Sequence, residues 1–113
     1  MNTFPFKLVQ NDSHTIVVEC EGEAFATHNP IFEKHEFSGN GYSWEGVIRH
    51  ILDEKNPELL THLDFDPEAG AFYAYVDSAE NLQKIVEVLL PVCSDLKQFD
   101  AYLSRIDPEE MDD

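Results

Sequence analysis

Residues 63–76 read LDFDPEAGAFYAYV, in which apolar and polar side chains alternate on both sides of the segment Pro67-Glu68-Ala69-Gly70. A period of two is typical of a β-strand with one buried face. With a four-residue loop, the segment predicts an antiparallel hairpin in which Asp66 lies opposite Ala71. This register separates an apolar face from a polar face: Leu63, Phe65, Phe72, Ala74 and Val76 on the first, and Asp64, Asp66, Tyr73 and Tyr75 on the second.

A second alternating pattern lies near the amino terminus and flanks Asn11-Asp12-Ser13, which is typical of a turn. Residues 4–10 and 15–21 are therefore predicted to form another hairpin. In its second strand the alternation separates Ile16, Val18 and Cys20 from Val17, Glu19 and Glu21. Between the hairpins the pattern weakens, and we expect a strand near 24–27 and an extended piece near 32–37, joined by loops.

The remaining segments follow the spacing of amphipathic helices. A helix over 44–56 is predicted to begin after Ser43 as its N-cap, and Asn56-Pro57 then starts a short second helix. A further helix follows Asp77, and Pro91 is expected to bend or end it. A last helix is expected near 95–105. The apolar stripes of the three longer helices are Trp44, Val47, Ile48, Ile51 and Leu52; Leu82, Ile85, Val86, Leu89 and Cys93; and Leu96, Phe99, Tyr102, Leu103 and Ile106.

This order of elements predicts a single α+β domain in which helices pack on one face of an antiparallel β-sheet. We expect the domain to span residues 1–106. Residues 107–113 read DPEEMDD and have no apolar periodicity, so they are expected to form an acidic, disordered tail.

The chain carries 23 Asp and Glu residues against 7 Lys and Arg residues among its 113 residues, a formal net charge of -16. Its 42% hydrophobic content and eight phenylalanines are enough for a core, so the charge must lie on a folded surface. Such a surface repels phosphate backbones and anionic lipid headgroups, which argues against nucleic acid and membranes as direct partners. A basic protein is the partner that this charge favours.

The two cysteines, Cys20 and Cys93, each fall within an apolar repeat and are expected to be reduced and buried. The amino terminus shows no basic region followed by an apolar run, which favours a cytoplasmic protein. Charge repulsion opposes self-association, but an apolar interface can overcome it, so the oligomeric state stays open.

Catalytic and metal-binding patterns are weak. The five histidines, His14, His28, His35, His50 and His62, show no HExxH motif or i, i+4 pair and are expected on the surface. A weak metal site formed by His28, Glu33, His35 and Glu36 is the alternative. No nucleophile elbow occurs, and Gly39-Asn40-Gly41 lacks the spacing and lysine of a phosphate loop, so it is interpreted as a turn or helix entry. We therefore expect no enzymatic activity, no metal and no cofactor.

If helices cover one face of the sheet, the polar sides of both hairpins share the other face. That face would carry Glu19, Glu21, Asp64, Asp66, Tyr73 and Tyr75. Tyrosine is enriched at interface hot spots, and carboxylates around it attract the arginines and lysines of a partner. These residues are our candidate partner-binding set; the alternative is a solvated face whose tyrosines shield the backbone.

The segments 39–44, GNGYSW, and 65–72, FDPEAGAF, resemble the immunity protein 51 family of bacterial polymorphic toxin systems. The resemblance is clearest over residues 39–76. It implies a cytoplasmic protein that binds one cognate toxin domain and neutralises it, without a cofactor or a reaction. With the charge, it suggests that the toxin has a basic binding surface. The alternatives are an acidic inhibitor or nucleic-acid mimic of another basic protein, and a small metal-dependent hydrolytic enzyme.

Overall fold

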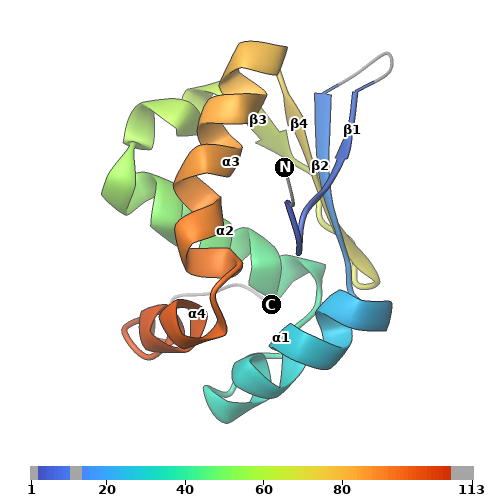
Figure 1. The fold of residues 1–113 in the computed structure, drawn as a ribbon, viewed down its shortest axis with the longest axis vertical. Coiled ribbons are helices and arrows are strands. Elements are labelled where there is room, and N and C mark those ends of the chain that lie inside the picture. Colours follow the sequence, from blue (N-terminus) through green and yellow to red (C-terminus); the bar gives the residue numbers. More distant parts are fainter. Residues whose placement is uncertain (1–2, 11–13, 108–113) are drawn as a thin grey trace.

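The computed structural model describes residues 3–10 and 14–107, and within them it shows an α+β domain. A four-stranded antiparallel sheet has the strand order β1-β2-β4-β3, and Figure 1 shows the helices gathered on one side of it. The strands are β1 (Lys7–Val9), β2 (His14–Glu19), β3 (Leu63–Phe65) and β4 (Ala71–Val76). The helices are α1 (Gly22–Lys34), α2 (Gly41–Lys55), the 3-10 helix η1 (Pro57–His62), α3 (Ala79–Cys93) and α4 (Leu96–Leu103).

The predicted fold class is thus confirmed, and the core lies between the sheet and the helices. α2 and α3 pack against β2 and β4, and α4 packs against α1 and α3. The apolar stripes predicted for α2 and α3 are buried throughout. In α4 the first stripe residue, Leu96, is 42% exposed, because it begins the helix at the protein surface, whereas Phe99, Tyr102 and Leu103 are buried.

The β3–β4 hairpin has the predicted faces but a different register. Leu63 lies opposite Val76 and Asp64 lies opposite Tyr75, so the pairing is shifted by two residues from the prediction. Glu68 and Ala71 form a bridge that closes a tighter, two-residue turn at Ala69-Gly70. Pro67 lies between two residues that bond to β4, because the Asp66 amide donates to Tyr73 and the Glu68 amide donates to Ala71, so the N–H that proline lacks would face the open edge of the sheet and no ladder hydrogen bond is lost. A shift of two residues keeps each side chain on its predicted face.

The prediction of strands and loops between residues 22 and 38 is wrong, because this region contains helix α1. Ala24, His28 and Phe32 recur every four residues and are buried, which gives α1 its core-facing stripe. Asn29-Pro30 suggested a loop, yet Pro30 lies exposed inside the helix. The burial of the stripe offsets the hydrogen bond that proline cannot make.

Helix α2 begins at Gly41, three residues earlier than predicted, and its N-cap is Asn40. The Asn40 side chain accepts a hydrogen bond of 2.9 Å from the Ser43 amide. Ser43 is instead buried, and its hydroxyl oxygen accepts a hydrogen bond from the Gly39 amide at 3.1 Å. A serine hydroxyl thus links the preceding turn to the helix.

The other helix boundaries are close to prediction. The N-cap of α3 is Ser78, one residue after the predicted Asp77, and the helix continues past Pro91 to Cys93. The short helix after Asn56-Pro57 is confirmed as η1. The predicted turn at 11–13 and nearly all of the predicted tail at 107–113 lie outside the described residues.

Gly41 allows α2 to contact the β3–β4 turn. A Cβ atom at this position would lie 2.0 Å from the carbonyl oxygen of Glu68 and 2.3 Å from that of Ala71. Both are backbone atoms of the hairpin, so they cannot rotate away as a side chain would. The Gly39-Asn40-Gly41 segment is therefore a helix entry, as the sequence suggested, fixed by a backbone contact.

His28 contradicts the prediction of a surface histidine, since it is only 1% exposed. Its Nε2 donates to the carbonyl oxygen of Cys93 at 2.8 Å, and its Nδ1 lies 2.8 Å from the Thr27 hydroxyl. Its ring packs against Trp44 and Phe99, with centroid distances of 5.4 and 4.9 Å. A neutral imidazole thereby joins α1 to the end of α3.

We predict that Gly41→Ala lowers the free energy of unfolding by about 1–3 kcal/mol, because the hairpin backbone has to move. Gly70→Ala is the control, since a Cβ there meets no atom within 4 Å. Chemical denaturation of both variants measures the difference. Equal losses would contradict the close approach of α2 to the turn.

A second prediction concerns acid stability. In the folded protein the pKa of His28 lies below its ordinary value of 6.5, mainly because the imidazole is buried. As the pH falls through the ordinary pKa of histidine, the unfolded chain takes up a proton at position 28 that the folded protein does not. The free energy of unfolding therefore decreases. The advantage of wild type over His28→Gln should therefore narrow between about pH 8 and pH 5.5, by no more than about 1.4 kcal/mol per pH unit. Urea denaturation across this range measures it; a constant difference would contradict the prediction.

Candidate partner-binding face

The two hairpins adjoin, because β2 pairs with β4 along its whole length, from His14 opposite Val76 to Glu19 opposite Ala71. The polar sides of both hairpins therefore belong to one surface, on the side of the sheet away from the helices (Figure 1). We call this surface the outer face and define it by Glu19, Asp64, Asp66, Tyr73 and Tyr75.

Tyr73 and Tyr75 occupy the centre of the outer face. Tyr73 lies opposite Val17, and Tyr75 lies between Thr15 on β2 and Asp64 on β3. Tyr75 is 42% exposed, whereas Val17 and Thr15 are 8% and 6% exposed although they point away from the helices. Side chains of the face itself must shield them. The outer face thus has an apolar base with tyrosines and carboxylates above it.

Tyr75 and Asp66 are joined within this face. The Tyr75 hydroxyl donates a hydrogen bond to Oδ2 of Asp66 at 3.2 Å. This bond, with the neighbouring carboxylates, raises the pKa of the Tyr75 hydroxyl above its ordinary value of 10. The phenol therefore remains a neutral hydrogen-bond donor, and it helps to hold Asp66 on the surface.

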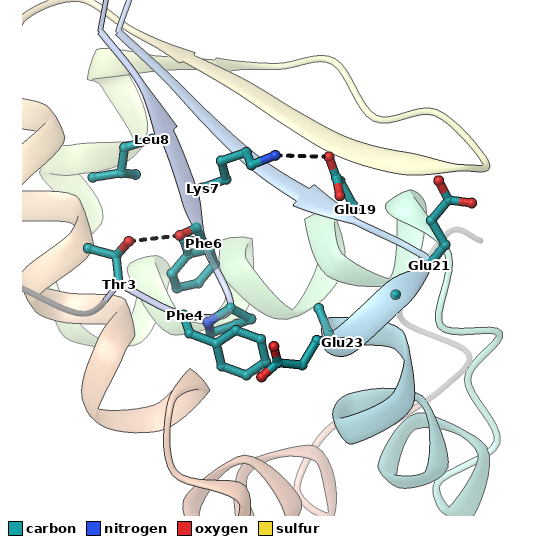
Figure 2. A pocket seen from close by; sticks show the side chains of 11 residues that line it. Thr3, Phe4, Phe6, Lys7, Leu8, Glu19, Glu21 and Glu23 are labelled. Atoms are coloured by element: carbon teal, nitrogen blue, oxygen red, sulfur yellow. Dashed lines mark hydrogen bonds and ion pairs between the residues drawn. The ribbon is translucent and has the colours of Figure 1, made fainter.

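Glu21 does not belong to the outer face. β2 ends at Glu19, and Glu21 is the N-cap residue of α1. Glu21 instead lines a cavity of about 500 Å³ at the open edge of β1. We call it the edge groove; its principal side chains are Phe4, Phe6, Lys7, Glu19, Glu21 and Glu23 (Figure 2).

The edge groove was missed from the sequence because it depends on α1. Glu23 lies in the first turn of this helix, in a region that was predicted to be strand and loop. The alternation of β2 assigned Glu19 to the correct side of the sheet, but it could not show that helix α1 begins three residues later, at Gly22. Glu19 also forms an ion pair with Lys7 at 3.3 Å, both side chains being more than half exposed.

The weak metal site considered for His28, Glu33, His35 and Glu36 is not formed. His28 is enclosed by aromatic rings, and Nε2 of His35 lies 2.6 Å from Oδ1 of Asp100. Glu33 accepts a hydrogen bond from the side chain of Asn29. Within residues 3–10 and 14–107, no group of three or more His, Cys, Asp or Glu side chains is arranged to hold a metal ion.

Both cysteines are free thiols, as predicted, but only Cys93 is fully buried, whereas Cys20 is partly exposed; burial raises the pKa of each thiol. A raised pKa keeps a thiol protonated, which is the opposite of what a cysteine nucleophile needs. The helices in the described part of the chain are too short or too polar to cross a membrane.

Comparison with protein families identifies one model, immunity protein 51, which matches residues 6–108. No curated protein and no solved structure shows a significant match. The match includes both segments that carried the resemblance, all four strands and all the helices. The chain therefore belongs to the immunity protein 51 family, and such proteins neutralise a cognate toxin, in general without enzymatic activity.

Proposed function

We propose that the protein neutralises its cognate toxin by occlusion, with the outer face covering a basic surface of the toxin. The observation that carries this proposal is the pairing of β2 with β4, which unites the carboxylates and tyrosines of two hairpins on one surface. Within the described residues, the helices pack on the opposite side of the sheet, so this surface is available to a partner.

The composition of the outer face suits association with a basic protein. Glu19, Asp64 and Asp66 are exposed and surround Tyr73 and Tyr75. Carboxylates at the rim accelerate encounter with a positive surface and orient the two proteins. Tyrosines near the centre supply contact area and a polar tip, and they slow dissociation.

The charge of the whole chain also supports a basic target. A net charge of -16 attracts a positively charged substrate cleft, such as that of a toxin that acts on nucleic acid. Covering such a cleft would exclude the substrate without any chemistry in the immunity protein. We place this encounter in the cytoplasm of the cell that makes the protein.

Reversing two outer-face charges, Asp64→Lys and Asp66→Lys, should slow association about tenfold at low salt and much less at high salt, because steering is screened. The partner in this experiment is the cognate toxin domain, used as an inactive variant, and the rates come from stopped-flow or surface plasmon resonance. The control, Glu58→Lys with Glu87→Lys, changes the net charge equally on exposed helical positions. Equal slowing in both variants would refute this choice of face.

Truncation of Tyr75 to alanine should raise the dissociation rate about tenfold and weaken protection of cells that express the toxin, since a central aromatic contact is lost. Tyr42→Ala is a matched control, because Tyr42 is 39% exposed but lies in the first turn of α2. Thermal unfolding of both variants checks that each is folded. If Tyr75→Ala dissociates no faster than Tyr42→Ala, the tyrosines are not at the interface.

A further inference from the structure

The strand β1 forms one edge of the sheet, with β2 on one side and, among the described residues, no strand on the other. The hydrogen bonds at the end of β2 show which backbone groups face this edge. The Cys20 amide donates to the carbonyl oxygen of Gly70, the residue directly opposite in the continued register of β2 and β4. Bonding alternates along an antiparallel strand, so the even-numbered residues of β2 bond to β4 and the odd-numbered residues bond to β1.

Leu8 is the residue of β1 whose backbone faces the open edge. Lys7 lies opposite Val17 and Val9 lies opposite Thr15, so Lys7 and Val9 bond to the odd-numbered residues of β2. The same alternation directs the N–H and C=O groups of Leu8 away from β2. A partner strand can therefore pair with the backbone of Leu8 without disturbing the sheet.

The amino-terminal segment already pairs with this edge. Phe6 lies two residues before Leu8 and faces the same way. Its amide donates to the carbonyl oxygen of Thr3 at 2.7 Å, and its carbonyl oxygen accepts a hydrogen bond of 2.8 Å from the Thr3 hydroxyl (Figure 2). These bonds agree with the direction inferred for Leu8, and they show that backbone beside β1 can bond to it. Thr3 covers the edge at Phe6, and the next position along the edge is Leu8.

A cavity of about 230 Å³ lies beside Leu8, between β1 and α3. Its apolar lining comes from Leu8, Leu82 and Val86, and we call it the α3 cavity. The side chains of Leu8 and Lys7 leave β1 in opposite directions (Figure 2), and Leu8 packs against the core. In a strand placed beside β1, the side chain next to Leu8 would point to the same side of the sheet, toward this cavity.

The opposite edge of the sheet, at β3, is less suited to receive a strand. Pro67 lacks the N–H group that would face this edge. The guanidinium group of Arg49 lies 4.5 Å from the centre of the Phe65 ring. A core-facing side chain of a strand added here would meet this charged group, whereas at β1 it would meet an apolar cavity.

We propose that an extended segment of the cognate toxin pairs with β1 as a fifth strand and inserts one apolar side chain into the α3 cavity. In this mode of recognition, main-chain hydrogen bonds supply affinity and pockets for alternate side chains supply specificity. The inference rests on the proposed function, because it takes a basic toxin as the partner. Two copies of this chain, each with a net charge of -16, repel one another, whereas a basic toxin is attracted.

Hydrogen exchange at the Leu8 amide, followed by NMR, tests the pairing. In the complex with the inactive toxin domain this amide should exchange at least tenfold more slowly than in the free protein, because it becomes hydrogen-bonded. The control is the Phe65 amide, which faces the open edge of β3 and should change much less. Unchanged exchange at Leu8 would overturn the proposal. Slowing in the free protein that increases with its own concentration would also overturn it, since the occupant would then be a second copy.

A pair of variants tests the α3 cavity. Gln83→Trp places a large side chain at the cavity and should raise the dissociation rate of the same complex at least tenfold, because the toxin side chain can no longer enter. Gln98→Trp makes the same change at an exposed position of α4 that does not line the cavity, and it should alter the rate less than twofold. Thermal unfolding checks that each variant is folded.

Equal dissociation rates for the two tryptophan variants would refute the insertion of a side chain. Both variants leave the outer face unchanged, so the two proposals fail separately. Slowed association of the Asp64 and Asp66 variant, together with an unprotected Leu8 amide, would refute the fifth strand alone.

Discussion

The pairing of β2 with β4 is the constraint on which the rest of the structure depends. Each of these strands has a neighbour in its own hairpin, β1 or β3, and a two-stranded hairpin is barely stable alone. Their pairing joins residues from distant parts of the chain, with Val18 opposite Phe72 and Ile16 opposite Ala74. These apolar pairs form the floor on which α2 and α3 pack, and the same register determines which side chains share the outer face.

The sequence predicted best the features that depend on local periodicity. Ile16, Val18, Phe72 and Ala74 face the core as expected, because alternation alone assigns a strand residue to a side. The buried stripe of α2 from Trp44 to Leu52 was predicted equally well, because the helical period identifies the apolar side of a helix whatever element packs against it. Fold class followed from the order of these patterns.

Features that depend on contacts between distant residues were less accessible. The register of β3 with β4 is set by a two-residue turn, which the α2 amino terminus contacts at Gly41, and the turn residues alone suggested a longer loop. Helix α1 was not predicted because its buried stripe includes His28, a polar residue. The hydrogen bond that allows His28 to be buried is made to Cys93 at the end of α3, which the local sequence does not indicate. The pairing of the hairpins, on which the candidate face depends, is likewise not encoded in either hairpin.

The placement of charge connects this fold to binding. A folded protein with a net charge of -16 is destabilised by repulsion among its own carboxylates, and the repulsion is greatest where they converge. Glu19, Glu21 and Glu23 follow one another where β2 passes into α1, and Lys7 is the one basic residue among those that line the edge groove. A basic partner would relieve this repulsion as well as form new contacts. Because such a partner binds the folded state alone, association also stabilises the fold, and an arrangement that is costly in the free protein becomes favourable in the complex.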